Sequence, residues 1–342
     1  MKKLLVLILS IATALSLAAC GNTSSGSSAS ENASSVSSAE SVSSAGNTDK
    51  IFHVGISQLV QHEALDAATK GFRDALSDKL GDKVIFDEQN AAGDSATSAT
   101  IANQFVASKY DLILGNATPA LQAAVSATDT IPVLGTSITD YATALDIDNW
   151  TGVTGYNVSG TSDLAPLDKQ AEMIKALFPD AKKVGILYCS AEPNSKYQAE
   201  TIKKYLADIG YTITDFTFAD SNDVTAVTQN ACANSDVIYI PTDNTAASCT
   251  EAINNVAEPA GIPIVSGEEG ICKGCGVATL SISYYDIGRT TGEMAYEILV
   301  NGADISTMAV QFASDTTYKY MPDRAEKLGV KIPEGYTAIE SK

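Results

Sequence analysis

From Ile51 onward, short apolar runs alternate with longer segments in which apolar residues recur at helical spacing. The short runs are rich in Val, Ile and Leu, which is typical of parallel strands buried on both faces. Strands that alternate with helices predict parallel sheets with helices on both faces. The predicted strands are 51–57, 83–87, 111–115, 131–134, 183–188, 211–218, 236–240, 262–265 and 277–281. The predicted helices are 63–80, 95–108, 118–128, 166–178, 195–209, 222–233, 244–259 and 285–300.

A strand–helix–strand unit occurs once in each half of this pattern. In 111–134 and in 236–265 the first strand begins with Asp and the second begins with Ile-Pro. Two similar halves predict an α/β fold of two lobes with a ligand cleft between them. The helical pattern at 285–300 follows the last strand of the second half, so we expect the chain to return there to the first lobe. We assign 51–159 plus 284–307 to lobe one and 161–282 plus 312–342 to lobe two.

The first fifty residues have a different character. A basic amino terminus precedes an apolar run that ends near Leu17. A basic start followed by roughly 7–15 apolar residues is typical of a secretory signal peptide, whereas a transmembrane helix needs about 20. The sequence LAAC that ends at Cys20 resembles the lipobox of bacterial lipoproteins, which implies a signal peptide at 1–19 and lipidation of Cys20. Residues 20–50 are mostly Ser, Ala, Gly and Asn, which predicts a disordered, lipid-anchored linker.

The chain is strongly acidic, with a formal net charge of -19. Nucleic acids bind through Lys and Arg, so we expect no nucleic-acid partner and assign the charge to solubility. The sequence has no Gly-x-Ser-x-Gly elbow, and no nucleophile lies at a suitable spacing from His62 and Glu63. We therefore expect a monomer that is not an enzyme, with no cofactor and no metal. Cys272 and Cys275 have the spacing of a zinc half-site, but a second ligand pair is missing; a local disulfide and two unlinked residues remain open.

Polar residues follow most of the predicted strands. In parallel sheets, ligands bind beyond the carboxyl ends of the strands, so these residues are expected to face the cleft. Their carboxylates outnumber nearby lysines, which suits an ammonium group, and free N–H groups at helix starts suit a carboxylate. Together these features indicate an amino acid, although each residue singly is also a good helix cap. The candidate ligand-binding residues are Gln58, Leu59, Thr118, Thr136, Ser137, Tyr156, Ser162, Asp163, Ser190, Glu192, Asn194, Ser195, Asp243, Asn244 and Glu268.

Two sets of candidates have distinct expected roles. We expect Asp243 and Glu268 to hold an ammonium group, because both follow strands of the second lobe. We expect a carboxylate to be held by Thr118, Ser190, Asn194 and Ser195, because each lies near a helix start. The ring of an aromatic ligand would need apolar or aromatic walls. The candidates are Leu59, Tyr156, Tyr188 and Tyr284, with Tyr156 preferred because it lies just before the first crossing to lobe two.

Several segments resemble the tryptophan/tyrosine-type family of ABC transporter substrate-binding proteins. They include GISQLVQHEALD (55–66), GTSDL (160–164), PTDNT (241–245) and YYDIGRTTGEMA (284–295). The resemblance implies a type I periplasmic-binding-protein fold of two Rossmann-like lobes joined by three crossovers. It also implies an extracytoplasmic protein that carries an aromatic amino acid to an ABC permease and its ATPase. A binding protein for a sugar or a nucleoside is the alternative, which the lack of Arg in the cleft loops disfavours.

Overall fold

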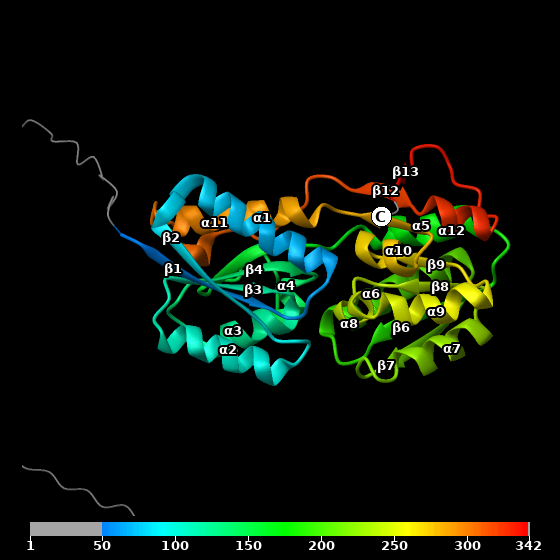
Figure 1. Cartoon of the computed structure of the whole chain (residues 1–342), viewed down its shortest axis with the longest axis horizontal. Helices are drawn as coiled ribbons and strands as arrows, with labels where there is room; N and C mark the ends of the chain where they lie inside the picture. The colour runs from blue at the N-terminus through cyan, green and yellow to red at the C-terminus, as the bar shows by residue number, and fades with distance from the viewer. Residues whose placement is uncertain (1–49, 341–342) are drawn as a thin grey trace, which may run out of the picture. The chain divides into compact units, whose positions relative to one another are not determined.

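The computed structural model describes residues 50–340 (Figure 1). These residues belong to one compact unit. The expected signal peptide (1–19), the lipidation site Cys20 and all of the expected linker except Lys50 lie outside the described residues. Among residues 50–340, no helix combines the length and the apolar character needed to cross a membrane.

The first sheet has six strands in the order β11-β5-β4-β3-β1-β2. Every neighbouring pair in it is parallel, as buried apolar runs joined by helices require. We call this sheet and its helices lobe one. Its strands are β1 (Phe52–Gln58), β2 (Val84–Asn90), β3 (Leu112–Asn116), β4 (Val133–Ile138), β5 (Val158–Ser162) and β11 (Gln311–Phe312). Its helices are α1 (Glu63–Leu80), α2 (Ser95–Ala107), α3 (Thr118–Ala127), α4 (Tyr141–Leu145) and α11 (Tyr284–Leu299).

The second sheet has seven strands in the order β13-β12-β10-β9-β8-β6-β7 and forms lobe two with its helices. Only the β10–β12 pair is antiparallel. Its strands are β6 (Lys183–Cys189), β7 (Thr212–Phe218), β8 (Val237–Ile240), β9 (Ile264–Ser266), β10 (Ala278–Ser281), β12 (Thr317–Tyr320) and β13 (Thr337–Ala338). Its helices are α5 (Leu167–Leu177), α6 (Pro193–Ile209), α7 (Val224–Asn234), α8 (Asn244–Ser248), α9 (Thr250–Ala260), α10 (Glu269–Cys275) and α12 (Pro322–Lys327).

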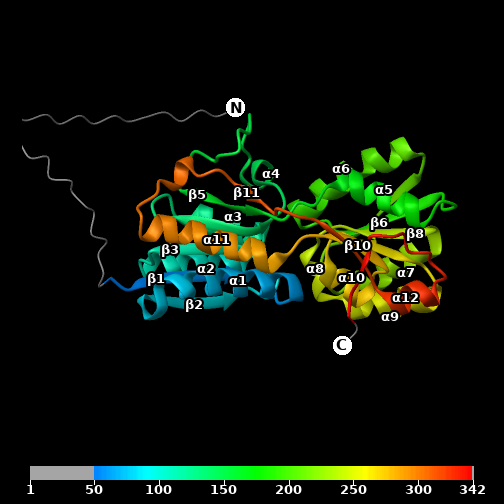
Figure 2. The same cartoon turned by 90° about the horizontal axis from the view of Figure 1, so that it is seen from above.

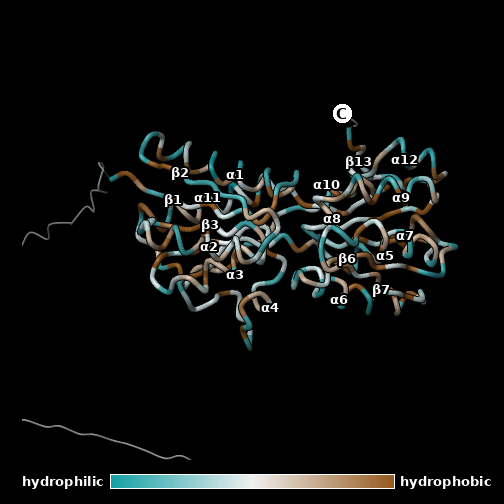
Figure 3. The backbone as a smooth tube through the Cα atoms, turned by 60° about the horizontal axis from the view of Figure 1, so that its bottom comes forward, coloured by the Kyte–Doolittle hydropathy of each residue, from teal (hydrophilic) through white to brown (hydrophobic). Residues whose placement is uncertain are grey.

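The chain crosses between the sheets three times, as the fold class predicted. The crossings follow β5, β10 and β11, and in Figure 2 they are the green, orange and red segments between the lobes. Pairing extends the first sheet to Ser162 and adds β11, slightly beyond the ranges assigned to lobe one from the sequence. Each sheet is packed between apolar clusters on its two faces. Figure 3 shows the alternation of apolar and polar stretches along the chain that underlies this layering.

Some elements differ from the sequence-based expectation. The nine expected strands are present, with ends shifted by a few residues. Strand β5 was not expected, because its sequence VSGTS has one large apolar residue. The expected helix 244–259 is instead two helices, α8 and α9, which meet at Cys249. Strands β11, β12 and β13, helices α4, α10 and α12, and the short 3-10 helices Gly81–Lys83 and Ile305–Thr307 are also additions.

Candidate functional site

The candidate residues gather where the parallel strands of each lobe end. Gln58 and Ser162 are the last residues of β1 and β5, and Thr118 begins the helix after β3. In lobe two, Glu192 follows β6, Asp243 follows β8 and Glu268 follows β9. The candidates are buried, apart from two that are exposed, Tyr156 and Ser190.

Tyr156 lies at the wrong edge of the sheet for the role expected of it. It comes two residues before β5, so it sits at the amino end of that strand. Its side chain is 61% exposed, and its backbone N–H donates to Thr154 Oγ1. The residues of β5 carry no strand pattern, and without that strand Tyr156 was expected to lie directly before the crossing. Tyr188 does not line the site either, because its ring packs in a lobe-two core and its hydroxyl lies 3.5 Å from Asp215 Oδ2.

Several candidates already have their hydrogen bonds within the protein. The amide of Gln58 contacts Asp66 Oδ1 at 2.7 Å and accepts from Thr69 Oγ1 at 2.7 Å, so it joins β1 to α1. The Ser162 hydroxyl donates to the Thr139 carbonyl at 2.9 Å. Thr136 Oγ1 lies 3.2 Å from Thr161 Oγ1, and the exposed Ser190 hydroxyl donates to the Phe218 carbonyl. These side chains shape the edge of the site rather than offering free groups to a ligand.

Glu192 holds three cleft residues together. Its carboxylate accepts from Asn194 Nδ2 at 3.1 Å and from the backbone N–H and Nδ2 of Asn244 at 3.0 and 2.6 Å. It also accepts from the backbone N–H and hydroxyl of Thr245 at 2.8 and 2.7 Å. A carboxylate has about four acceptor sites, so these donors saturate it. Glu192 therefore positions its neighbours and has no capacity left for a ligand's ammonium group.

The two carboxylates expected to bind an ammonium group both cap helices. Asp243 accepts from the backbone N–H groups of Ala246 at 2.7 Å and Cys189 at 2.6 Å. Burial, followed by the nearby negative charge of Glu192, raises the pKa of Asp243. Glu268 accepts from the backbone N–H groups of Gly270 and Ile271 at the start of α10. Burial raises the pKa of Glu268 to about 7, against the lowering effect of those hydrogen bonds.

Asp163 lies at the first crossing and bonds to two hydroxyls. Tyr284, at the start of α11, donates to Asp163 Oδ2 at 2.8 Å, and Thr139 donates to Oδ1 at 3.3 Å. Thr139 Oγ1 in turn accepts from Gln198 Nε2 of α6 at 3.3 Å. Burial raises the pKa of Asp163 to about 6, because both hydroxyl donors only partly offset the loss of water. This chain of contacts connects lobe one to lobe two behind the cleft.

Five buried polar atoms near the carboxyl ends of strands in the two lobes have no hydrogen-bond partner among the described residues. Most buried polar groups in proteins are paired, and an unpaired one costs about 1–3 kcal/mol. Ala117 and Ser137 also have φ angles of 87° and 57°, and Ser137 lies where the β4–β5 register is irregular. Unpaired atoms and backbone strain at the same place are typical of a binding site. The atoms are Ser57 Oγ, Asn116 Oδ1, Thr118 Oγ1 and Ser137 Oγ of lobe one and Asn194 Oδ1 of lobe two.

Three polar contacts join the lobes around these atoms. His62 Nε2 lies 3.3 Å from Asn244 Oδ1, and Lys273 donates to Glu63 at 2.7 Å. The third is the Gln198–Thr139 contact described above. Neither Thr139 nor Gln198 was among the residues expected to line the cleft. Gln198 lies inside α6, and Thr139 lies directly after β4, which ends four residues beyond the strand expected at 131–134. Ser57 and Asn116 were not expected to line the cleft either, although both lie at the carboxyl ends of expected strands.

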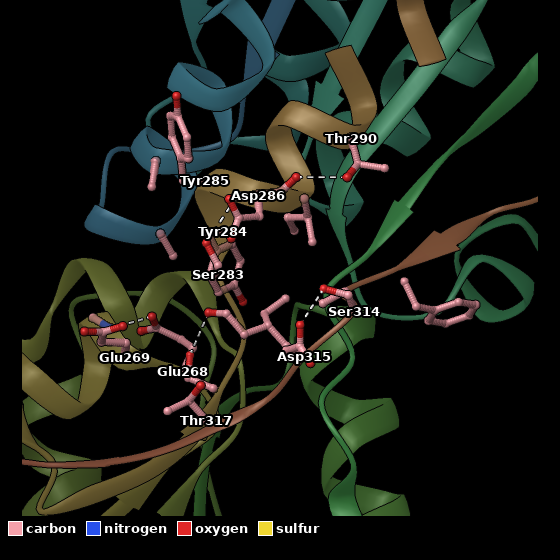
Figure 4. Close-up of a pocket in the computed structure, with 18 of the residues that line it drawn as sticks. Glu268, Glu269, Ser283, Tyr284, Tyr285, Asp286, Thr290, Ser314, Asp315 and Thr317 are labelled. Atoms are coloured by element: carbon pink, nitrogen blue, oxygen red, sulfur yellow. Dashed lines mark hydrogen bonds between the residues drawn. The ribbon is translucent and has the colours of Figure 1, made fainter. Parts of the chain in front are cut away.

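A cavity of about 570 Å³ adjoins the site on the side of the crossings (Figure 4). Its lining includes the buried Glu268 and Tyr284 and the crossing segment with Ser314 and Asp315, which Figure 4 shows in sticks. Lys319 pairs with Glu269 at 2.6 Å in its wall. Residues 50–340 contain no cluster of three or more His, Cys, Asp or Glu residues arranged to hold a metal.

Cys272 and Cys275 are both free and buried in the structure. Burial raises the pKa of Cys275 to about 12 and that of Cys272 well above its usual value. Thiols with raised pKa values are poor nucleophiles and poor metal ligands at neutral pH. Of the two alternatives left open by the sequence, the structure therefore has the pair as unlinked side chains of α10.

Comparisons with known proteins agree on one kind of protein. A family model described as ABC transporter substrate binding protein matches residues 53–340. A tyrosine-binding protein from Clostridioides difficile (strain R20291) is 38% identical over 267 residues, which cover 77% of each chain. The structure of an ABC domain in complex with L-Trp from Streptococcus pneumonia has a TM-score of 0.81 and 34% identity, covering 85% of this chain and 100% of that one. The ligand-free, open structure of a substrate binding protein with adhesive properties from Clostridium difficile has a TM-score of 0.65 and 36% identity, with the same coverage.

Proposed function

Since the chain belongs to the family of ABC transporter substrate binding proteins, we propose that it binds an aromatic amino acid between its two lobes and delivers it to an ABC importer. The names of its relatives support the ligand class, because one is a tyrosine-binding protein and another was solved with L-Trp. Both relatives are more than 30% identical to this chain over most of its length. The importer's permease and ATPase are the proposed partners.

The proposal is carried by the unpaired polar atoms that lie near the carboxyl ends of strands in both lobes. Thr118 and Ser137 supply free hydroxyls, and Thr118 begins the ten-residue helix α3, whose free N–H groups favour an anion. We assign these two residues to the ligand's carboxylate. The free atom of Asn194 is its acceptor Oδ1, because Nδ2 faces Glu192 Oε2 and the Thr242 carbonyl. Asn194 is therefore assigned to the ammonium group, not to the carboxylate as expected from the sequence.

An apolar wall for the ligand's ring is available beside these polar groups. Leu59 follows β1 directly and is 3% exposed. It packs in a small cluster with Leu65, Ala117 and Ala120, so the first turn of α3 is apolar on this side. Leu59 also lines a cavity of about 230 Å³ together with Glu192 and Asn244 of lobe two. Burying a ring there adds apolar contact without a further polar partner. We propose Leu59 as the ring contact in place of Tyr156.

The likeness to solved relatives supports a cleft that closes on the ligand. The two solved relatives have similar identity to this chain, 34% and 36%, but TM-scores of 0.81 with the L-Trp complex and 0.65 with the ligand-free open structure. The lobes described here are thus arranged more like those of the ligand complex. Contacts split between two lobes are complete only in such a closed form.

The proposed location follows from the amino terminus. We propose that the chain is extracytoplasmic and held at the cell membrane by lipid on Cys20. Two or more acyl chains on one cysteine give durable anchoring, whereas one chain binds membranes only marginally. Replacing Cys20 by Ala should release the protein from washed cell membranes into the soluble fraction, and a Cys20→Ala protein that stays with the membrane would contradict lipid anchoring.

A ligand panel tests the proposed function. The chain from Ala45 onward, which forms one compact unit, would be melted in the presence of each amino acid, several sugars and several nucleosides. A ligand that binds only the folded state raises Tm, by about 2.7 kcal/mol of stabilisation at a concentration of 100 Kd. We expect tyrosine, tryptophan or phenylalanine to raise Tm and then to bind in calorimetry. A rise only with a sugar or nucleoside would overturn the ligand class.

A further inference from the structure

His62 contacts the opposite lobe at the edge of the proposed site. It lies directly before α1 of lobe one, where its side chain does not cap the helix. Its Nε2 atom is instead 3.3 Å from Asn244 Oδ1, at the start of α8 in lobe two. The side chain of Asn244 is buried, and that of His62 is partly buried. The contact is thus shielded from water on one side, where hydrogen bonds are stronger than at the surface.

The direction of this hydrogen bond follows from the environment of Asn244. Its Nδ2 lies 2.6 Å from Glu192 Oε2, and a carboxylate can only accept. The NH2 group of Asn244 must therefore face Glu192, and its oxygen must face His62. His62 is then the donor, which fixes the neutral ring as the Nε2–H tautomer. Burial is the largest influence on the pKa of His62 and lowers it, although Asn244, Glu192 and Asp66 act to raise it.

The His62–Asn244 contact is linked to Asn194, the proposed ammonium acceptor, through the carboxylate of Glu192. Glu192 binds Asn244 with two hydrogen bonds and also accepts from Asn194 Nδ2 at 3.1 Å. That last bond orients Asn194, so that its Oδ1 is free for the ligand. We infer that His62 is a positioning residue: when the lobes close, it donates to Asn244 and so secures the Glu192-centred loops around the bound ligand.

The three contacts between the lobes differ in exposure. Glu63, the residue next to His62, forms an ion pair with Lys273, but its side chain is 55% exposed. An exposed ion pair contributes little, because water and salt screen it. The His62–Asn244 bond involves less charge but is better shielded from water, and it ends directly on Asn244, which Glu192 holds. The buried Gln198–Thr139 contact reaches α6 instead. Loss of this bond should open the closed form faster and leave the open form unaffected.

Ligand dissociation rates test the inference, which rests on the proposed function. Stopped-flow kinetics would use tyrosine, tryptophan or phenylalanine, and, if none of them binds, whichever sugar or nucleoside does. We expect His62→Ala to raise koff by roughly 3- to 10-fold, the equivalent of one neutral hydrogen bond, with kon unchanged. His62→Gln keeps an N–H donor and should recover most of the loss. Glu63→Gln is the matched control at the neighbouring exposed contact and should change koff by less than about twofold.

Two results with the single variant would overturn the inference. One is a His62→Ala protein with wild-type koff. The other is a His62→Ala protein whose ligand-free form unfolds at a lower urea concentration and whose kon is lower, with no recovery in His62→Gln. That combination would indicate a purely structural role. The double variant His62→Ala/Asn244→Ala should dissociate no faster than Asn244→Ala alone, since the bond is already lost. A fully additive double variant would also contradict it. Binding of a non-aromatic ligand would overturn the proposed ligand class while leaving this test intact.

Discussion

At the scale of single residues, buried polar side chains in the cleft divide into two groups by their hydrogen bonds. Glu192, Asp243 and Gln58 are bonded to backbone and side-chain partners within the protein. Thr118, Ser137 and Asn194 keep one atom without a partner. Because burying an unpaired polar atom costs stability, it is tolerated where a ligand repays it. The paired group fixes the shape of the site, and the unpaired group is available for recognition.

Asp163 provides a pH-dependent test at this scale. Its pKa rises from 3.8 to about 6 on folding, so the ionised form is disfavoured in the folded state by up to about 3 kcal/mol. The stability associated with neutral Asp163 is therefore fully present below about pH 4. It is lost as the pH rises through 6. Asp163→Asn, with neighbouring hydroxyls that can turn to accept, should be more stable than wild type by about 1–3 kcal/mol at pH 7.5 and equal to it near pH 4.

Urea unfolding of the ligand-free protein at both pH values measures this difference. Asp74→Asn is a control of opposite sign, because hydrogen bonds from Lys70 and Tyr285 lower the pKa of Asp74. That variant should be less stable than wild type at neutral pH, since ionised Asp74 stabilises the fold above its usual pKa. An Asp163→Asn protein that loses stability at pH 7.5 would show that Asp163 is ionised at no cost.

The positions of Thr118 and Asn194 in the fold were predictable from the sequence, but the atom that each leaves unpaired was not. Both follow predicted strands, and in the structure both lie beyond the carboxyl ends of strands, where the rule for parallel sheets expects ligand-binding residues. Which atom of Asn194 stays free depends on Glu192 and Thr242, and the Glu192 contact pattern depends on where α8 begins. That arrangement is tertiary and leaves no local signal. Tyr156 was misplaced because the polar, small residues of β5 hide a strand.

At the scale of elements, the pairing of α1 with α11 brings residues 221 positions apart in the chain, Glu63 and Tyr284, to one end of the helix pair. Figures 1 and 2 show the two helices side by side, and they approach most closely at glycines. A Cβ on Gly288 would lie 2.1 Å from the Ala68 carbonyl oxygen, and one on Gly71 would lie 2.1 Å from the Tyr285 carbonyl oxygen. At these two glycines the contact between α1 and α11 therefore has room for a hydrogen atom but not for a side chain.

Gly288→Ala tests this close approach. Alanine is favoured over glycine inside a helix by about 1 kcal/mol, but overpacking typically costs about 1–3 kcal/mol. The added Cβ would clash with backbone atoms, which cannot rotate out of the way. We therefore expect the cost of the clash to exceed the gain in helix propensity, so that the urea midpoint falls. Glu293→Ala, at an exposed position of the same helix, is the control and should change stability by less than about 0.5 kcal/mol. An unchanged or raised midpoint for Gly288→Ala would contradict the close packing.

Elements with strong apolar patterns were predictable, and those held by tertiary contacts were not. Strands such as β6, with its run of Val, Ile and Leu, and amphipathic helices such as α1 carry their own signal. Helix α10 has seven residues and two glycines, and its carboxyl end is held by Arg324, which donates to the carbonyls of Lys273 and Gly274 at 2.9 and 2.6 Å. A local sequence pattern cannot predict a helix that depends on an arginine some fifty residues away.

At the scale of the whole molecule, the proposed function requires the lobes to move. The ligand groups assigned here are divided, with Thr118 and Ser137 in lobe one and Asn194 in lobe two. The His62–Asn244 and Glu63–Lys273 contacts also join the lobes, so we expect them to be lost in an open form. A ligand that binds across both lobes shifts the population towards the closed form by the difference in its affinity for the two forms. A permease can then distinguish loaded from empty protein by shape alone.

The three crossings are the segments able to absorb such a motion, because each is short and joins one sheet to the other. They lie at 163–166, 282–283 and 313–316, between the elements that flank them. We expect small-angle scattering of the ligand-free chain from Ala45 onward to show a larger radius of gyration than at saturating ligand, since hinge closure compacts the molecule. Asn194→Ala, which removes the proposed ammonium acceptor without touching a crossing, should need more ligand for the same change. A ligand that binds in calorimetry yet leaves the scattering curve of both proteins unchanged would mean that the cleft does not close, because binding across two separated lobes cannot occur without bringing them together.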